Sequence, residues 1–205
     1  MIGEMAVKVL VSTAYLPPAE YFSLFQKADE ILIEREENYL KQSYRNRCYI
    51  LSAHGIQLLT VPVYLGSLHK TSIKDIRIDY SKRWQKVHLG AIVASYNSSP
   101  YFQYYFDDIE KIISGNFEFL IDLNMKLTEL ILKMLKIKAK PAWSSHFEPA
   151  VNEAYDYRYR LTPKKISEYK VKEYLQVFSG KNGLVQQLSV LDLIFNTGPE
   201  ASSYL

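Results

Sequence analysis

The chain has 205 residues, of which 48% are hydrophobic and 23% charged, and this composition suits one globular domain with a substantial core. A formal net charge of +3 is small for a dedicated nucleic-acid-binding protein, which usually carries a strongly basic face. The single cysteine, Cys48, excludes an internal disulfide, and neither a signal peptide nor a membrane-spanning apolar run is recognisable. We therefore expect a single domain over residues 1–205 in the cytoplasm.

The first part of the chain predicts a βαβ unit. Residues 6–11, AVKVLV, form a short run rich in β-branched residues, which indicates a buried strand. Pro17 and Pro18 suit the first turn of a helix, where a missing N–H costs nothing, and residues 29–34 return to a strand pattern. Strand, helix and strand in so short a span imply a right-handed crossover between parallel strands.

The middle of the chain predicts a hairpin, a further strand and two helices. Residues 48–65 hold two apolar runs on either side of Ala53-His54-Gly55, which is typical of a β-hairpin. The isoleucines within residues 72–78 indicate another strand. Helices are expected within residues 82–96 and 102–114, because apolar residues recur there at roughly helical intervals.

The last third predicts two helices separated by a long irregular segment. Apolar residues recur at three- and four-residue steps from Leu120 to Ile137, which indicates a core helix. Residues 138–165 are polar and rich in tyrosine and proline, a pattern often found in lids and binding loops. A final helix should end at Gly198-Pro199. The predicted fold is α/β: a Rossmann-like three-layer arrangement with a mainly parallel sheet starting with a βαβ unit, plus a β-hairpin and C-terminal helices.

Common cofactor and metal motifs are missing. The sequence has no glycine-rich phosphate loop and no G-x-S-x-G nucleophile elbow. Its 4 histidines are scattered, and with one cysteine they make no zinc-binding pattern. The sequence therefore identifies no cofactor, and we expect no metal site.

A basic stretch follows the predicted βαβ unit. Lys41, Arg45 and Arg47 lie close together in NYLKQSYRNRC, just after the second strand. Ligands of open α/β sheets bind outside the carboxyl ends of parallel strands, and guanidinium groups bind phosphate or carboxylate through paired hydrogen bonds. The stretch therefore predicts a small anionic ligand, such as a nucleotide sugar or an acyl donor, held by these side chains. The alternative is a solvated loop whose basic residues balance nearby glutamates.

Tyrosine is unusually frequent in this chain, with 17 residues. Their amphipathic rings often line sugar and nucleotide sites, so we expect Tyr39, Tyr44 or Tyr101 to stack on a ring of the ligand. Wet cores and interfaces use the same rings, and packing is the alternative role for each of them.

A succession of short motifs along the chain carries a family resemblance. In chain order they are YLPPAEYF, ADEILIEREENYLKQSYRNRC, LLTVPV, WQKVHLGAIVASYNSSPYFQYY, the pair Ser144-Ser145, and LSVLDLIFNTGP. This order resembles the WbqC-like family of bacterial proteins, which occur in gene clusters for O-antigen and other surface polysaccharides. The resemblance implies a transferase of an acyl or aminoacyl group, with glycine as one candidate, acting on a nucleotide-linked or amino sugar.

The basic stretch and the resemblance together give a set of candidate site residues. His88 is the candidate general base, since a histidine pKa lies near the working pH, and Lys86 is the second catalytic candidate. A packing histidine is the alternative for His88. The ligand-binding candidates are Tyr15, Pro17, Lys41, Tyr44, Arg45, Asn46, Arg47, Tyr101, Ser144 and Ser145. Asp192 lies inside an apolar helix and is expected to bond to backbone or to a basic group.

Two other classes of function are open. Many relatives carry His-Gln-Pro ahead of Tyr-Leu-Pro, where this chain has Val11-Ser12-Thr13, and its segment between Ser145 and the terminal helix is short. Both departures favour a non-catalytic ligand-binding or assembly protein of the polysaccharide machinery. A single-stranded nucleic-acid binder is the least favoured class, because it needs an extended basic groove and the sequence shows one basic cluster. A second copy of the chain is a further candidate partner.

Overall fold

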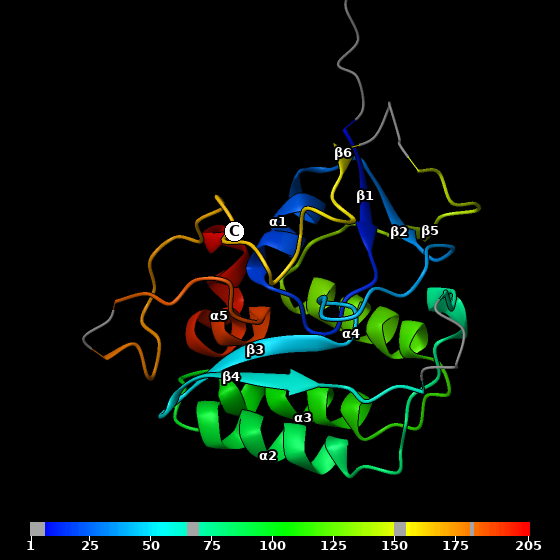
Figure 1. Ribbon diagram of the computed structural model, residues 1–205. Helices are drawn as coiled ribbons and strands as arrows, with labels where there is room; N and C mark the ends of the chain where they lie inside the picture. Colours follow the sequence, from blue (N-terminus) through cyan, green and yellow to red (C-terminus); the bar gives the residue numbers. More distant parts are fainter. Residues whose placement is uncertain (1–6, 65–69, 150–154, 181–182) are drawn as a thin grey trace, which may run out of the picture.

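The computed structural model describes residues 7–64, 70–149, 155–180 and 183–205. Its larger sheet contains four parallel strands in the order β5-β2-β1-β6 (Figure 1). These strands are β1 (Lys8–Ser12), β2 (Glu30–Glu34), β5 (Ala142–Trp143) and β6 (Tyr155–Asp156). The parallel sheet predicted from the sequence is thereby confirmed.

The βαβ unit is formed by β1, α1 (Ala19–Lys27) and β2. The helix begins directly after Pro18, so both prolines precede it, and neither lies in its first turn as predicted. The two long strands pair in register from Lys8 opposite Glu30 to Ser12 opposite Glu34. Side chains alternate between the two faces of a strand, so the apolar residues that enter the main core are separated by residues on the opposite face.

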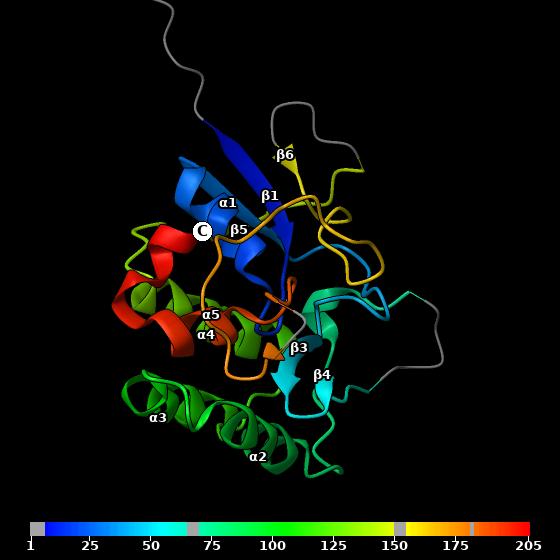
Figure 2. The same cartoon turned by 90° about the vertical axis from the view of Figure 1, so that its left-hand side faces the viewer.

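The hairpin consists of β3 (Arg47–Ser52) and β4 (Gly55–Thr60), as predicted. Gly55 takes a positive φ of 103°, a conformation that side-chain-bearing residues rarely adopt, and this explains the glycine at the turn. The helices are α2 (Trp84–Tyr96), α3 (Phe102–Ile113), α4 (Leu120–Met134) and α5 (Val190–Thr197). In both Figure 1 and Figure 2, α2 and α3 run side by side beyond the hairpin, away from the parallel sheet.

One hydrophobic cluster joins both sheets to the helices. It includes Val11 of β1, Ile50 of β3, Leu127 of α4 and Phe195 of α5, all with no measurable exposure. The predicted core role of the helix around Leu127 is confirmed. Because one core connects these elements, the carboxyl ends of the parallel strands are held in a fixed relation to the start of β3.

The strand predicted within residues 72–78 is absent. Ile73–Asp75 forms a 3-10 turn, in which the N–H of Ile76 donates to the carbonyl of Ile73 at 3.3 Å. The Ile76 carbonyl then accepts from the N–H of Leu120 at 2.9 Å. Two of the isoleucines are three positions apart, and the tight turn buries both on one side. The spacing of these isoleucines belongs to a tight turn, so the prediction of a strand here is wrong.

Residues 138–165 are less irregular than predicted. They supply β5 and β6, which extend the parallel sheet at both edges. Strands of two residues produce almost no periodic signal, so sequence patterns could not reveal them. Ser144 follows β5 and bonds to Glu34 at the end of β2, and Arg158 follows β6 and bonds to Ser12 at the end of β1. These two residues of the segment therefore lie where a binding loop of this sheet is expected.

Candidate functional site

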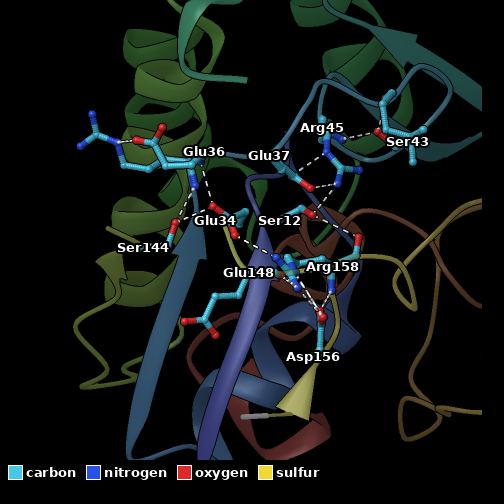
Figure 3. A network of polar contacts seen from close by, with 12 residues as sticks. Ser12, Glu34, Glu36, Glu37, Ser43, Arg45, Ser144, Glu148, Asp156 and Arg158 are labelled. Carbon is cyan, nitrogen blue, oxygen red and sulfur yellow. Dashed lines mark hydrogen bonds and ion pairs between the residues drawn. The ribbon is translucent and has the colours of Figure 1, made fainter. Parts of the chain in front are cut away.

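The strand order of the parallel sheet reverses at β1. From β1 the chain crosses to β2 on one side, whereas β6 pairs with the other side of β1. In open α/β sheets, ligands bind outside the carboxyl ends of the strands at such a point. Ser12 ends β1, Glu34 ends β2 and Asp156 ends β6, so polar side chains gather at this edge (Figure 3).

Arg45 forms one half of a buried ion network at this edge. Its Nε donates to Oε1 of Glu37 at 2.8 Å and its Nη2 donates to Oε2 at 2.5 Å. A third hydrogen bond runs from Nη2 to Oγ of Ser12 at 2.6 Å. The Arg45 side chain is 2% exposed and that of Glu37 is fully buried. The charge of Arg45 is therefore balanced inside the protein.

Arg158 forms the other half of the network. Its Nη1 donates to Oε2 of Glu34 at 2.9 Å, its Nη2 donates to Oδ2 of Asp156 at 2.7 Å, and both side chains of the Arg158–Glu34 pair are almost fully buried. Nη2 also donates to the backbone carbonyl of Glu148 at 2.7 Å. This arginine thus ties β2, β6 and the loop after β5 together.

Two serines connect and complete the network. Ser12 accepts from Arg45 and donates its own hydroxyl to the carbonyl of Arg158 at 3.1 Å. Ser144 donates to Oε1 of Glu34 at 2.6 Å and accepts from the N–H of Arg35. The buried network contains one more carboxylate than guanidinium groups, so by itself it would repel an added anion.

Arg47 differs from Arg45 and Arg158. It lies at the start of β3, is partly buried, and its Nε is enclosed without a hydrogen-bond partner in the described part of the chain. Among those residues it also makes no ion pair, and neither does exposed Lys41. Burial raises the pKa of Tyr39, while the charges of Arg47 and Arg45 lower it. Within the described part of the chain, no ion pair therefore balances the charges of Arg47 and Lys41.

Comparison with known proteins places this arrangement in a family. A model of the WbqC-like protein family matches residues 13–164, a range that contains Glu34, Arg45, Arg47 and Arg158. The chain belongs to the WbqC-like protein family. It is 28% identical over 225 residues to the uncharacterized protein Rv1507c of Mycobacterium tuberculosis, and the match covers 96% of each chain. No solved structure matches.

His88 of this WbqC-like chain lies in a buried aromatic cluster with Tyr15 and Trp84. Its Nε2 lies 3.2 Å from the carbonyl of Thr60, which can only accept, so Nε2 carries the proton and Nδ1 accepts from the Tyr15 hydroxyl at 2.8 Å. Burial lowers the pKa of His88 to about 4. Both ring nitrogens are thus occupied, and the predicted general-base role gains no support. Lys86 is exposed on α2.

Several other predicted ligand-binding residues make hydrogen bonds that connect the segments around the site. The carbonyl of Pro17 accepts from the N–H of Val190, and the amide of Asn46 donates to the carbonyl of Val61. Tyr44 is buried and its carbonyl accepts from the N–H of Tyr15. Their direct contact with a ligand stays a prediction. Tyr101 lies at a different place, against Gly198 at the end of α5.

Sequence reasoning missed part of the site. In the loop after β5, the side chain of exposed Ser145 contacts His146, and His146 in turn contacts Glu148. Exposed Tyr159 lies over both buried arginines, with its ring centre 6.0 Å from Cζ of Arg45 and 5.8 Å from Cζ of Arg158. The order Ser-Ser-His-Phe-Glu at residues 144–148 could have suggested the polar groups of this loop. Nothing in the sequence indicated that Arg158 is buried.

The described ranges contain neither a metal-binding cluster nor a helix able to span a membrane. Among these residues, no cluster of three or more histidine, cysteine, aspartate or glutamate side chains could hold a metal ion. The helices there include none with the length and apolar character that crossing a membrane requires.

Asp192 of α5 is a second buried carboxyl group, and it predicts a pH-dependent stability. Its Oδ1 accepts from the hydroxyl of Tyr174 at 2.7 Å and from Nε2 of Gln176 at 2.9 Å, while Oδ2 has no partner among the described residues. The sequence suggested a bond to backbone or to a basic group, but the partners of this carboxyl group within the described ranges are the side chains of Tyr174 and Gln176. Burial raises the pKa of Asp192 in the folded state. The folded chain therefore holds this proton more tightly than the unfolded chain.

Because the folded-state pKa is raised, the stabilising contribution of protonated Asp192 is full below its unfolded pKa and is lost as pH rises through the folded pKa. Asp192→Asn keeps the shape without the charge, so its free energy of unfolding should exceed that of the native chain increasingly as pH rises. Urea unfolding of both proteins between about pH 4 and about pH 8 measures the difference. A difference that stays constant with pH would contradict the buried neutral carboxyl group.

Proposed function

We propose that this WbqC-like protein is an acyl or aminoacyl transferase, with glycine as one candidate group, that acts on a nucleotide-linked or amino sugar in bacterial surface-polysaccharide biosynthesis. Arg47 and Lys41 hold the anionic group of the ligand at the carboxyl-end edge of the parallel sheet. The proposed reaction is what the resemblance to WbqC-like proteins implies, and the local geometry of Arg47 supports the anion site.

The observation that carries this proposal is the unbalanced guanidinium group of Arg47. Arg47 is partly buried, and its Nε, an enclosed donor that normally has an acceptor, is without a partner among the described residues. A phosphate or carboxylate oxygen would supply the missing acceptor and charge. Arg45 cannot take this role as readily, because Glu37 and Ser12 already accept from it. The proposed anion site is therefore Arg47, with exposed Lys41 adding a second charge.

An exposed aromatic ring lies over the buried ion network. Tyr159 is 51% exposed although it lies over two guanidinium groups. An exposed ring held in a fixed position is suited to stack on a sugar or a base. We therefore assign the stacking role first expected of Tyr39, Tyr44 or Tyr101 to Tyr159.

Arg47→Gln should weaken binding of a nucleotide sugar by about tenfold to a hundredfold, because a hydrogen bond to a charged group contributes about 1.5–3 kcal/mol. A thermal-shift screen of nucleotide sugars, acyl-coenzyme A species and simple phosphates identifies the ligand, since binding to the native state raises the melting temperature. Arg83→Gln is the matched control, because Arg83 is exposed just before α2. An equal melting shift in the native chain and in Arg47→Gln would contradict the anion site.

A non-catalytic ligand-binding or assembly protein is the alternative function. The buried position of His88, with both ring nitrogens occupied, favours it because the predicted base is then unavailable. Incubation with an acyl donor and a nucleotide-linked amino sugar, followed by mass spectrometry of the sugar, separates the two functions. Binding of both compounds without formation of an acylated sugar would favour the alternative.

A further inference from the structure

Two consecutive polar contacts join three residues beside the ion network, and the proposed anion site does not use them. Oγ of Ser145 lies 2.9 Å from Nδ1 of His146, and Nε2 of His146 lies 2.5 Å from Oε1 of Glu148. A carboxylate oxygen can only accept, so Nε2 carries the proton and Nδ1 is free to accept from the serine hydroxyl. The order of groups is hydroxyl, imidazole and carboxylate, the arrangement that activates a serine for attack on a carbonyl carbon.

The loop that carries these groups is fixed at three points. Before Ser145, the hydroxyl of Ser144 donates to buried Glu34 at 2.6 Å. After His146, the Phe147 ring centre lies 5.0 Å from Cζ of Arg158, and the carbonyl of Glu148 accepts from Nη2 of the same arginine. Both ends of the loop are therefore bound to the buried ion network (Figure 3). This attachment holds the reactive groups in place before a substrate arrives.

A small hollow opens directly beneath the loop. Its volume is about 100 Å³, and its lining residues are Leu10, Leu32, Glu34, Ser144, Ser145, His146 and Glu148. A water molecule in the liquid occupies about 30 Å³, so the hollow has room for a group the size of an acetyl or glycyl group. Leu10 of β1 and Leu32 of β2 give the lining its apolar part, and Ser145 belongs to the same lining. An acyl group can therefore reach the serine hydroxyl from the hollow.

We propose that Ser145 is the nucleophile of the transferase, that His146 is its general base, and that Glu148 is a positioning residue for the imidazole. This inference rests on the proposed function and specifies its reaction centre. It assigns the role of general base to exposed His146 instead of buried His88. The covalent intermediate is then Ser145 carrying the acyl group as an ester.

The first half of the reaction acylates Ser145. Oγ attacks the carbonyl carbon of an activated acyl donor, such as a thioester or an acyl phosphate. The oxygen–carbon bond forms, and the bond from that carbon to the thiolate or phosphate breaks. The hydroxyl proton passes to Nδ1 of His146 and then to the leaving group.

The second half transfers the acyl group to an amino sugar. The sugar nitrogen attacks the ester carbon, the carbon–nitrogen bond forms, and the carbon–Oγ bond breaks. One proton of the amine passes through His146 to the oxygen of Ser145, which restores the hydroxyl. No electron acceptor or donor is needed, and the products are an amide and the free donor group.

Acetylation by p-nitrophenyl acetate tests the nucleophile without knowledge of the natural substrates. The full chain should release nitrophenolate in a burst, and peptide mass spectrometry should locate one acetyl group on Ser145. Ser145→Ala should abolish the burst. His146→Ala should slow acetylation by about a hundredfold, the lower end of the usual effect of a general base. Glu148→Gln should slow it as well, and Glu148→Asp should restore part of the rate.

Matched controls separate this reaction from nonspecific acetylation of exposed side chains. His54 is an exposed histidine on the hairpin turn, and Ser203 is an exposed serine near the C-terminus. His54→Ala and Ser203→Ala should acetylate at the native rate. Acetyl groups spread over lysines, an acetyl group on Ser144, or an unchanged rate in His146→Ala would overturn the assignment. Each variant must melt at the native temperature for its rate to be compared.

The inference and the proposed function fail in different ways. If acetylation of Ser145 is absent while a nucleotide sugar still raises the melting temperature through Arg47, the reaction centre is wrong and the anion site stands. If Ser145 reacts as expected but no nucleotide sugar or acyl donor binds, the reaction centre stands and the ligand assignment is wrong. Ser145→Ala should keep the full thermal shift with a nucleotide sugar, because it leaves Arg47 and Lys41 unchanged.

Discussion

Arg158→Met is expected to lower the free energy of unfolding by about 3–5 kcal/mol, because it leaves buried carboxylates without their partner. Arg158 is the largest fully buried side chain of the protein among the residues described, and it donates to Glu34, to Asp156 and to the Glu148 carbonyl. Methionine fills a similar volume but cannot donate. The charge of Glu34 would then lie uncompensated in the interior.

Urea unfolding and thermal melting measure this loss, which corresponds to about 10 °C in melting temperature for a chain of this size. The double variant Arg158→Met/Glu34→Gln should recover part of the stability, since it removes the stranded charge as well. Arg160→Met is the matched control: Arg160 is exposed and lies over the Tyr157 ring at 4.4 Å, so a change within about 0.5 kcal/mol is expected. Equal losses in both arginine variants would contradict the network's structural role.

Gly198→Ala is expected to lower the free energy of unfolding by about 2–4 kcal/mol, through backbone strain and a steric clash. Gly198 ends α5 with a φ of 58°, which favours glycine. A Cβ atom there would lie 2.4 Å from Cδ1 of the Tyr101 ring. The ring would have to move, although the N–H of Tyr101 is bonded to the carbonyl of Phe195.

Chemical denaturation of three variants separates the two causes of this loss. Tyr101→Leu/Gly198→Ala should recover the part caused by the clash and keep the part caused by the positive φ. Gly90→Ala is the control, because Gly90 lies within α2 with open space where Cβ would lie, and alanine there should stabilise the helix by up to about 1 kcal/mol. A Gly198→Ala protein as stable as the native chain would show that the backbone at the end of α5 adapts easily.

Much of the fold could be predicted because its elements are long and periodic. The helix around Leu127 repeats apolar residues over many turns, and the first strand–helix–strand unit has clear start and stop signals. The error within residues 72–78 came from isoleucines whose spacing fits a strand as well as a tight turn. The strands β5 and β6 are too short for any pattern, and only pairing with β2 and β1 creates them.

The site was harder to predict because charge balance depends on tertiary contacts. Arg45 of the predicted basic stretch does bond to Ser12 at the end of β1, but the sequence could not separate Arg45, paired with Glu37, from Arg47, which lacks such a partner among the described residues. Arg158 reaches Glu34 across 124 positions of sequence, a contact that no local pattern shows. His88 looked reactive beside basic residues, yet the fold buries it.

The most direct test of the central claim is calorimetric titration of the native chain and of Arg47→Gln with a uridine diphosphate sugar, each at low and at high salt. The proposed anion site predicts binding to the native chain that weakens as salt increases, because salt screens the charges of Arg47 and Lys41. It also predicts binding to Arg47→Gln that is at least about tenfold weaker. Equal affinity of the two proteins, or affinity that does not change with salt, would contradict the anion site at the carboxyl ends of the sheet.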